Sequence, residues 1–372
     1  MKIALFGGPG RQAACRPWCA PVVALALLAG ALGVPPLRAA PLAEADARPA
    51  LAVAAFQHSV IQAVHNTGKR LVAVGERGLI LLSDDDGASW RQARVPVSVG
   101  LTAVRFPTPS QGWAVGHFGT VLHSADGGES WQVQLRGGQA AELMLADARL
   151  RARDDVEQSA AVASAQRMVD DGPDKPLLDL YFADEQHGIV VGAYNLILAT
   201  RDGGQTWQSL SARLDNPGAR HLYAIAGGGS SLYIAGEEGR VFRSDDLGAS
   251  FTRLATPYQG SYFTVAADAA SVVVAGLRGN AFRSSDRGQT WSQLQSPAPV
   301  SVVASLLGRD GRLILANQAG QLLESRDQDA RLQPLAAAPL PPPTGLALQA
   351  SGELLVSSLQ GLVRPAVRPA QH

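Results

Sequence analysis

The chain has 372 residues, of which 46% are hydrophobic and 17% are charged, and it contains 39 glycines and 23 prolines. This composition is typical of a globular, turn-rich protein that is long enough for a large core. Its 32 basic and 32 acidic residues balance and form no basic stripe of the kind that nucleic acid requires, so nucleic-acid binding is not a predicted function.

The first 39 residues are predicted to be a secretory signal peptide. Lys2, Arg11 and Arg16 precede an apolar run over residues 20–34, and small residues follow at and after Ala39. A run of about fifteen residues is short for a membrane span and suits a secretory signal. An uncleaved N-terminal anchor is the alternative. We therefore expect the protein to be secreted across the inner membrane and to reside in the periplasm.

Both cysteines, Cys15 and Cys19, lie within this predicted signal segment. Cys19 precedes the apolar run instead of following it, which argues against a lipid-attachment cysteine. Cleavage leaves a mature protein with no cysteine, which excludes disulfides and thiol catalysis. It also removes four of the 32 basic residues, so 28 basic residues remain against 32 acidic ones, a net charge of about −4.

One pattern recurs along the rest of the chain. A Gly-x-x-Gly turn is followed by a Ser-x-Asp-x-Gly-x-x-Trp motif, the Asp box, as in VGHFGTVLHSADGGESW at residues 115–131. Related copies occupy residues 75–90, 192–207, 236–251 and 276–291, with a degenerate copy at 317–332 and the front half of a seventh at 358–361. A four-stranded unit of about 40 residues is a propeller blade, so seven copies predict an all-β, seven-bladed β-propeller.

Each repeat is expected to supply four strands in the same order. A second strand ends in the Gly-x-x-Gly turn, a third leads into the Asp box, and the Trp opens a fourth. The first, inner strands are predicted at residues 59–64, 101–106, 177–182, 221–226, 262–267 and 300–306, with the last inside 344–361. We assign residues 50–367 to the propeller and residues 368–372 to a disordered tail.

The step from Trp131 to Trp207 is much longer than the other steps between repeats. The excess lies in residues 137–176, which are rich in Ala, Leu, Glu, Gln and Arg and contain no Gly or Pro from 139 to 171. This composition predicts one or two helices inserted between the second and third blades. The apolar face is poor, so we expect the insertion to lie on the propeller surface.

The last repeat lacks an Asp box, so its blade is expected to lack an outer strand and to leave a sheet edge open. The segment Ala50–Ala55 is the predicted donor of that strand. Pairing of this N-terminal segment with the C-terminal strands would then close the ring.

The Asp boxes are predicted to be structural turns. The carboxylate accepts backbone N–H groups, as in an Asx turn, glycine adopts a conformation that other residues avoid, and the aromatic ring packs between blades. A calcium or ligand site is the alternative. The residues assigned this structural role are Asp85, Trp90, Asp126, Trp131, Asp202, Trp207, Asp246, Phe251, Asp286 and Trp291.

The Gly-x-x-Gly turns and the connections between blades are predicted to share one face, because successive turns of an up-and-down blade alternate faces. A face that collects aromatic side chains, arginines and an insertion is a candidate partner-binding face, and ordinary solvated loops are the alternative. The residues assigned to it are Arg77, His117, Phe118, Tyr194, Arg213, Arg220, Tyr258, Leu277 and Arg278.

These repeats resemble those of the photosystem II stability/assembly factor family, which are of the bacterial neuraminidase (Asp-box) type. The resemblance rests on GWAVGHFGTVLHSADGGESW (112–131) and HGIVVGAYNLILATRDGGQTW (187–207), and GPDKPLLDLYF (172–182) is similar to a bacterial form of the family. It implies a seven-bladed propeller on the extracytoplasmic side that binds membrane-protein partners during assembly. Photosynthetic members use an arginine-rich patch, and no arginine of this chain is matched to it one by one.

A sialidase-like glycoside hydrolase or glycan-binding propeller is the alternative function, because Asp boxes also occur in sialidases. Catalysis would need two placed carboxylates, or a tyrosine nucleophile with an acid partner. Arg105 stands in an ordinary inner-strand position, and no glutamate is obviously paired with Tyr181, Tyr194 or Tyr223. We therefore predict a monomeric, non-catalytic scaffold for a membrane or envelope protein, with no metal, cofactor or obligate small molecule.

Overall fold

The computed structural model describes residues 43–152, 156–308, 310–326, 329–335 and 338–366. The predicted signal peptide and C-terminal tail lie outside these residues. Among the helices that are described, none is long and apolar enough to cross a membrane.

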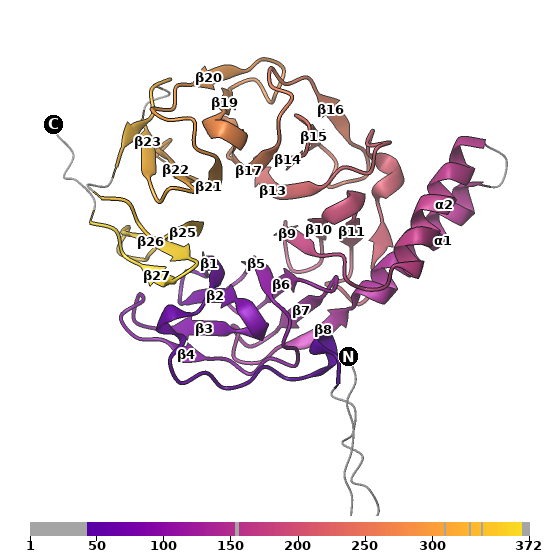
Figure 1. Cartoon of the computed structure of the whole chain (residues 1–372), viewed down its shortest axis with the longest axis horizontal. Helices are drawn as coiled ribbons and strands as arrows, with labels where there is room; N and C mark the ends of the chain where they lie inside the picture. The colour runs from indigo at the N-terminus through magenta and orange to yellow at the C-terminus, as the bar shows by residue number, and fades with distance from the viewer. Residues whose placement is uncertain (1–42, 153–155, 309, 327–328, 336–337, 367–372) are drawn as a thin grey trace, which may run out of the picture. The chain divides into compact units, whose positions relative to one another are not determined.

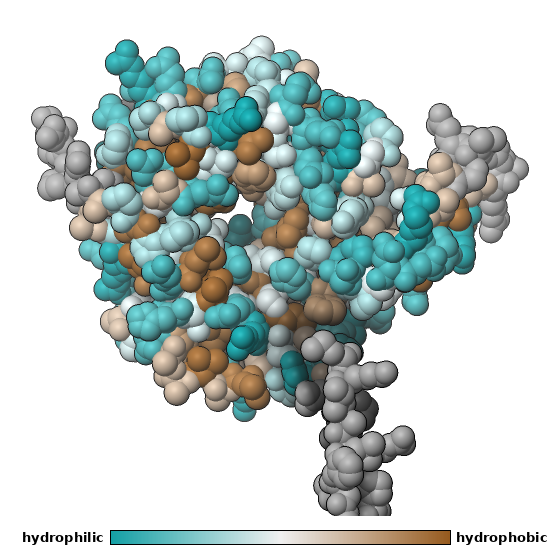
Figure 2. Space-filling view, in the orientation of Figure 1, coloured by the Kyte–Doolittle hydropathy of each residue, from teal (hydrophilic) through white to brown (hydrophobic). Residues whose placement is uncertain are grey.

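Seven antiparallel sheets surround a central opening, which confirms the seven-bladed propeller (Figures 1 and 2). Blades 1 to 3 comprise β1 (Ile61–Asn66), β2 (Leu71–Gly75), β3 (Ile80–Ser83) and β4 (Arg91–Gln92); β5 (Leu101–Arg105), β6 (Gly112–Gly116), β7 (Val121–Ser124) and β8 (Gln132–Leu135); and β9 (Leu177–Phe182), β10 (Gly188–Gly192), β11 (Ile197–Thr200) and β12 (Gln208–Ser209).

Blades 4 to 7 repeat the plan, with one strand fewer in the last. They comprise β13 (Leu222–Gly228), β14 (Ser231–Gly236), β15 (Val241–Ser244) and β16 (Thr252–Leu254); β17 (Tyr262–Ala267), β18 (Val272–Gly276), β19 (Ala281–Ser284) and β20 (Ser292–Leu294); β21 (Val302–Leu307), β22 (Leu313–Asn317), β23 (Leu322–Ser325) and β24 (Gln333–Pro334); and β25 (Pro343–Leu348), β26 (Leu354–Ser358) and β27 (Gly361–Val363).

The core lies mainly between neighbouring blades. The second strand of every blade is buried along its whole length, as in LVAVG of β2 and VVVAG of β18. Both faces of these strands are covered, which explains why their sequences are continuous apolar runs without alternation. Several apolar clusters accordingly join strands of two adjacent blades, such as the one that combines Val74 of blade 1 with Val104 and Trp131 of blade 2.

The first glycine of the Gly-x-x-Gly turn is required by a close backbone approach. Gly75 ends β2 opposite Ile61, where the pairing of β1 and β2 is interrupted by a bulge. A Cβ atom on Gly75 would lie 2.1 Å from the carbonyl oxygen of Val60. The same irregularity recurs where β5 meets Gly116 and where β17 meets Gly276, so the repeated glycine sets the register of the inner strands.

The ring closes without the predicted strand donation. Ala50–Ala55 form no strand: the Ala50 N–H donates to the Val95 carbonyl at 3.0 Å, and the Gln92 side chain bonds the Leu51 carbonyl and the Val53 N–H at 2.9 Å each. The segment therefore follows the outer strand of blade 1. In the described part of the chain blade 7 keeps three strands. The prediction was wrong because the glutamine of β4 satisfies backbone groups that strand pairing would have used.

Hydrogen bonds from blade 7 to the first Asp box close the rim of the ring. Asp86 has a left-handed backbone conformation (φ 57°). Its carboxylate accepts the N–H groups of Ala350 at 2.8 Å and Ser351 at 3.1 Å, and its carbonyl accepts Arg364 Nη2 at 2.7 Å and the Gln349 amide. A single turn of blade 1 thus binds two separate parts of blade 7.

The inner strands of the same two blades are also bonded to each other. Thr344 Oγ1 donates to the Ile61 carbonyl at 2.6 Å, and Asn66 Nδ2 donates to the Leu348 carbonyl at 2.9 Å. Blades 1 and 7 are therefore held together both at the axis and at the rim of the ring.

Two helices form the insertion, α1 (Gly137–Arg151) and α2 (Val156–Asp170), and together they make a hairpin that projects outward from the ring (Figure 1). The Gly137 N–H donates to the Phe118 carbonyl at 2.7 Å. Ala140, Ala141 and Met144 of α1 are buried in the core cluster shared by blades 2 and 3. The hairpin is therefore packed into the propeller and does not only lie on it, because small residues make contacts that a search for large apolar residues misses.

Candidate partner-binding face

The Gly-x-x-Gly turns lie beside the connections between blades, as the alternation of turns predicts. The His117 N–H donates to the Gly100 carbonyl at 2.8 Å, and the Gly239 N–H donates to the Gly260 carbonyl at 2.9 Å. The insertion begins at the same level, because a Cβ atom on Gly119 would lie 2.6 Å from the Cα of Gly137. Turns, connections and hairpin thus belong to one face of the ring.

Five turns display a side chain in a strained backbone conformation. The residues at this position in blades 1 to 5 have φ between 53° and 58°. This left-handed conformation costs a residue other than glycine about 1 kcal/mol. Glycine would avoid this strain, and the same conformation also recurs in Asp boxes, at Leu247 and Arg287. The five residues are Arg77, Phe118, Tyr194, Glu238 and Arg278.

The structure places the nine residues assigned to this face in two environments. Four are exposed: Arg77, His117, Tyr194 and Arg278. Phe118, Arg213, Arg220, Tyr258 and Leu277 are half-buried.

Two of the half-buried residues are occupied by contacts within the chain. Arg213 Nη1 donates to the Gly248 carbonyl at 3.0 Å, so its charge points to the Asp box of blade 4. Arg220 Nε lies 2.9 Å from a carboxylate oxygen of Glu238. A role in partner binding remains a prediction for all nine residues.

A buried asparagine pair fixes the connection between blades 3 and 4, residues 211–220. Asn195 stands where the other turns have their second glycine, with φ 61°. It accepts a hydrogen bond from Asn216 Nδ2 at 2.9 Å and donates to the Ser211 carbonyl at 3.2 Å. Asn216 also donates to the Arg220 carbonyl at 2.9 Å. This pair was not predicted from the sequence, although Asn195 is a visible departure from the repeat.

A groove with a volume of about 790 Å³ separates the hairpin from this connection. The volume is within the range of about 300–1,000 Å³ that is typical of ligand sites. Small side chains on both walls alternate with charged ones, such as Asp147 and Arg167 of the hairpin and Asp215 of the connection. Residues that line it include Ala148, Ala161 and Ser164 from the hairpin, Ala212 and Gly218 from the connection, and Tyr194.

A tyrosine–glutamate pair lies next to the groove and corrects one prediction. Tyr223 donates its hydroxyl to Glu237 Oε1 at 3.2 Å, whereas the sequence showed no glutamate paired with a tyrosine. Burial, followed by the nearby charge of Glu237, raises the pKa of Tyr223 to about 12. An adjacent carboxylate can act as the general base for a tyrosine nucleophile, so sialidase chemistry at this pair would depend on arginines that are free to bind a substrate carboxylate.

Arg105 is part of an ion pair between blades, not of a cluster that could bind a substrate carboxylate. Its Nη2 lies 3.8 Å from Asp179 Oδ1. Asp179 is bonded across to the next blade, because its other oxygen accepts the Ile225 N–H at 3.0 Å. Burial raises the pKa of Asp179, and Arg105 opposes this effect. These contacts give Arg105 a structural role.

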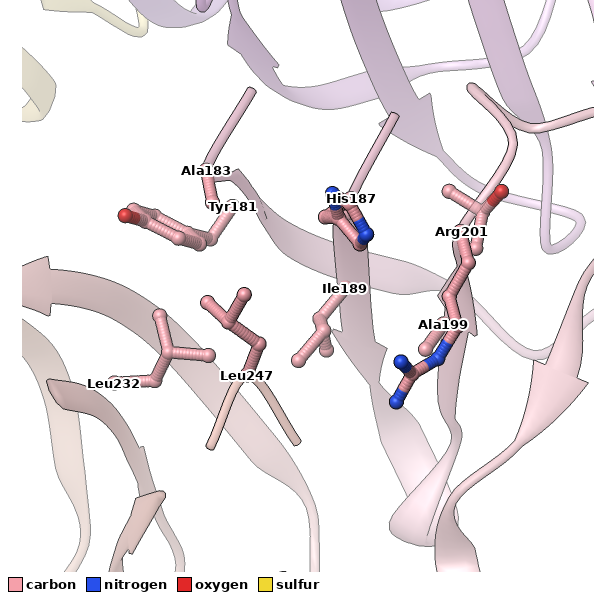
Figure 3. Close-up of a pocket in the computed structure, with 10 residues that line it drawn as sticks. Tyr181, Ala183, His187, Ile189, Ala199, Arg201, Leu232 and Leu247 are labelled. Atoms are coloured by element: carbon pink, nitrogen blue, oxygen red, sulfur yellow. The ribbon is translucent and has the colours of Figure 1, made fainter. Parts of the chain in front are cut away.

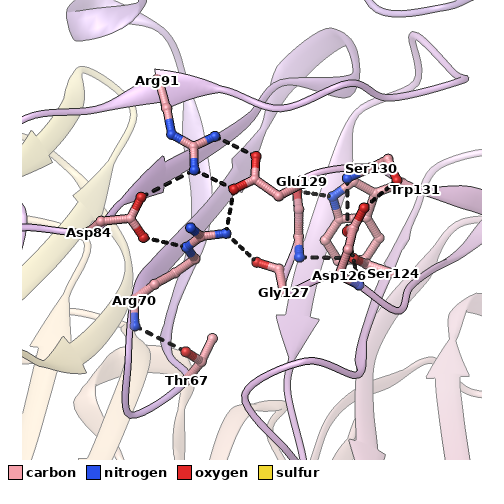
Figure 4. Close-up of polar contacts among 11 residues, drawn as sticks. Thr67, Arg70, Asp84, Arg91, Ser124, Asp126, Gly127, Glu129, Ser130 and Trp131 are labelled. Carbon is pink, nitrogen blue, oxygen red and sulfur yellow. Dashed lines mark hydrogen bonds and ion pairs between the residues drawn. The ribbon is translucent and has the colours of Figure 1, made fainter.

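The Asp boxes form closed hydrogen-bond networks within their own turns (Figure 4). Asp126 Oδ1 accepts Ser124 Oγ at 2.8 Å and the Ser130 N–H at 3.0 Å, while Oδ2 accepts Ser130 Oγ at 2.5 Å. Trp131 Nε1 donates to the Gly128 carbonyl at 2.9 Å. The boxes at Asp85, Asp202, Asp246 and Asp286 repeat the carboxylate bonds.

Arginines at the rim tie the first two blades together next to this box (Figure 4). Arg91 contacts Asp84 at 3.1 Å and, through Nη1, Glu129 at 2.6 Å. Arg70 contacts Asp84 at 2.6 Å and donates to the Gly127 carbonyl at 3.0 Å. Hydrogen bonds from these arginines lower the pKa values of Asp84 and Glu129. The carboxylates are exposed, so each pair contributes modestly, about 0–1 kcal/mol.

The protein is expected to lose stability in acid. Hydrogen bonds from Ser89 lower the pKa of Asp85 to about 2, and Thr206 and Ser250 lower the pKa values of Asp202 and Asp246. These carboxylates stabilise the fold fully above the unfolded pKa of about 3.9, and the contribution is lost as pH falls toward about 2. Thermal unfolding followed by circular dichroism should show a steady Tm above pH 5 and a falling Tm below pH 4. A constant Tm down to pH 2 would contradict this.

A small slot lies between blades 3 and 4 on the Asp-box side (Figure 3). Leu247, which is 45% exposed and has φ 52°, faces Leu232 and Ile189 there. The slot has a volume of about 10 Å³, close to the smallest volume that holds one water molecule. It is too small to receive a ligand.

Comparison with known proteins identifies relatives of these repeats. Residues 158–325 match the family model described as Photosynthesis system II assembly factor YCF48. A photosystem II assembly protein Ycf48 from Synechococcus sp. (strain JA-2-3B'a(2-13)) is 33% identical over 162 residues, 39% of this chain and 46% of that protein. A photosystem II assembly lipoprotein Ycf48 from Synechococcus sp. (strain CC9902) is 38% identical over 77 residues, 21% of this chain and 23% of that protein. The chain thus spans less than half the length of either relative.

Solved structures show similarity over larger parts of the ring. The WD40 propeller domain of Doa1 matches 87% of this chain and 97% of that chain with a TM-score of 0.60 and 10% identity. This likeness supports the propeller fold alone. A structure of YCF48 bound to D1 peptide matches 48% of this chain and 59% of that chain, with a TM-score of 0.41 and 22% identity.

Proposed function

We propose that this chain, which belongs to the YCF48 family of photosystem II assembly factors as its repeats predicted, is a non-catalytic scaffold that binds another protein during assembly. The observation that carries the proposal is the Gly-x-x-Gly face itself, where Arg77, Tyr194 and Arg278 are exposed beside the connections between blades. The hairpin and its groove lie on that same face. Aromatic and arginine side chains of this kind are enriched at protein–protein interfaces.

We assign the partner to the membrane or the envelope and the protein to the periplasm, as a monomer. The apolar run in the first 39 residues supports secretion, and the relatives named as photosystem II assembly proteins support a role in building a membrane complex. The partner-binding face is the one that carries Arg77, Tyr194 and Arg278.

The glycoside hydrolase alternative would need arginines that are free to bind the carboxylate of the substrate. The candidate nucleophile is Tyr223, whose hydroxyl contacts Glu237 at 3.2 Å. The arginines next to it are already paired: Arg220 and Arg240 both contact Glu238, at 2.9 and 2.8 Å. We therefore expect that the purified protein does not hydrolyse a fluorogenic sialoside.

Replacing Arg77, Tyr194 and Arg278 together with glycine is expected to reduce partner binding at least about tenfold, the effect of losing roughly 1.4 kcal/mol. All three residues are exposed and have positive φ, so glycine removes side chains and strain without opening the core. The measurement is recovery of the partner by affinity capture from the native host after cross-linking.

A matched control is available on the opposite face. Leu247 and Arg287 have φ values of 52° and 58° in Asp boxes, so Leu247→Gly with Arg287→Gly relieves the same type of strain. This variant should capture the partner as the wild type does. Equal capture by the variant at residues 77, 194 and 278 would reject the assigned face.

A further inference from the structure

The hairpin carries the only sulfur-containing side chains beyond the predicted signal segment. The chain has three methionines and two cysteines, and Met1, Cys15 and Cys19 lie within its first 19 residues. The other two methionines are Met144 of α1 and Met168 of α2. Sulfur chemistry in the propeller is therefore confined to the two helices of the hairpin.

These two methionines are the largest hairpin side chains that are buried in the core of the ring. The apolar cluster shared by blades 2 and 3 buries four residues of the hairpin: Ala140, Ala141, Met144 and Met168. Leu143 and Val169 are only partly buried against this cluster. Met168 is the one residue of α2 in the buried set. The attachment of the hairpin therefore depends on two flexible thioether side chains, of the kind that fills irregular gaps in cores.

The same two side chains can be reached from the groove beside the hairpin, because both line it. Met144 is 7% exposed and Met168 is 8% exposed, so each keeps a small surface in contact with solvent. The groove has a volume of about 790 Å³, which is ample for a molecule as small as hydrogen peroxide. Susceptibility to oxidation rises with exposure, so a thioether beside an open groove is more reactive than one enclosed in a core.

Oxidation at these positions would disturb the packing of the hairpin. A sulfoxide replaces the apolar, flexible thioether with a polar and chiral group. The cluster that surrounds both methionines is made of hydrophobic side chains, among them Leu177, Leu180 and Leu196. A polar oxygen that is buried there without a hydrogen-bond partner is costly, and movement of the hairpin away from the ring exposes the oxygen to water.

We propose that Met144 and Met168 form an oxidation site, at which a hydroperoxide converts both thioethers to sulfoxides and thereby loosens the hairpin from the ring. In each step the sulfur donates an electron pair to one peroxide oxygen, an S–O bond forms and the O–O bond breaks. The proton of the transferred oxygen passes to the departing oxygen. The sulfur is oxidised by two electrons, and hydrogen peroxide is reduced to water.

The test treats the purified protein with hydrogen peroxide and uses mass spectrometry for two measurements. Peptide mapping should show one added oxygen at Met144 and one at Met168 while the ring remains folded. Hydrogen exchange of the backbone amides in residues 137–170 should become at least about tenfold faster after oxidation, because the hairpin opens more often. Exchange in the buried strands β14 and β18 should stay unchanged.

Met144→Leu combined with Met168→Leu is the matched control. Leucine has nearly the volume of methionine and cannot be oxidised, so this variant is expected to fold. Peroxide should leave the hydrogen exchange of its hairpin unchanged. The proposal is overturned if neither methionine gains oxygen in the folded protein, if the oxidised hairpin exchanges at its original rate, or if the leucine variant responds to peroxide as the wild type does.

The consequence for the partner rests on the proposed function and is measured separately. Oxidised wild type should capture the host partner about tenfold less than untreated wild type, and the leucine variant should capture equal amounts before and after treatment. A loosened hairpin in a protein that captures no partner would support the oxidation site and contradict the scaffold function. Capture of the partner by a protein whose hairpin is unaffected by peroxide would support the scaffold function and overturn the oxidation site.

Discussion

Replacing Trp113 with alanine is expected to lower the free energy of unfolding by about 3–5 kcal/mol. Trp113 is 1% exposed and its ring stacks on Phe182 of the next blade, with centroids 3.9 Å apart. Its Nε1 donates to Gln134 at 3.0 Å, and Gln134 donates to the Gly203 carbonyl in the Asp box of blade 3 at 2.8 Å. The substitution therefore creates a cavity and releases a glutamine that joins two blades. Urea denaturation of the purified protein measures the loss.

Trp291 supplies the matched control for this prediction. It occupies an Asp-box position and is only half-buried, in contact with the cluster of blades 4 and 5. Trp291→Ala should therefore destabilise the protein by less than half as much as Trp113→Ala. Equal losses for the two variants, or a loss below about 1 kcal/mol for Trp113→Ala, would show that packing between blades is not the main source of stability.

The number and order of the blades could be predicted because each repeat carries its own turn chemistry. The Gly75 turn and the Asp85 box are local: their glycines, serines and carboxylates bond within a few residues of each other. The insertion could be located for a similar reason. The boxes are evenly spaced, so the one long interval, from Trp131 to Trp207, indicated inserted residues. Features that depend on bonds inside a repeat are visible in the sequence.

Closure of the ring was predicted, but the segments that close it were not, because they are set by contacts between the two ends of the chain. Asp86 lies in a box that looks like the others, yet only its distant neighbours Ala350 and Ser351 give it a role in closure. Ala50–Ala55 looked like a possible strand, but the Gln92 side chain bonds its backbone. Hydrogen bonds from a side chain to a distant backbone segment cannot be predicted from the pattern of apolar residues in the sequence.

The candidate face was predictable in outline and not in detail. The alternation of turns predicted that Arg77, Tyr194 and Arg278 lie on one face. Their shared left-handed backbone conformation became visible only in the structure. The contact of Tyr223 with Glu237 depends on the pairing of β13 with β14, where a register shift lies between Leu222 and Ala224. A bulge changes which side chains face each other, so this pair could not be read from spacing alone.

Deleting residues 139–171, with Gly138 joined to Gly172, is expected to abolish partner binding. The start and end of the hairpin are adjacent, because a Cβ atom on Gly137 would lie 2.4 Å from the Pro173 carbonyl oxygen. The join therefore leaves the blades connected while it removes one wall of the groove. Circular dichroism should show a folded ring with a lower Tm, since Met144 and its neighbours leave the core.

A smaller change tests the same wall without touching the core. Ala161 is exposed and lines the groove, whereas Ala163 is exposed and does not line it. Ala161→Glu should reduce partner binding because a longer, acidic side chain narrows the groove, and Ala163→Glu should leave binding unchanged. Equal effects of the two substitutions would mean that the groove is not part of the interface.

The most direct test of the scaffold function is cross-linking of the tagged protein in its native host, followed by mass spectrometry of the captured proteins. We predict one dominant membrane protein, captured by the wild type and by Ala163→Glu and lost in the 139–171 deletion and in Ala161→Glu. Undiminished capture by the deletion, or no reproducible membrane protein with the wild type, would contradict the account.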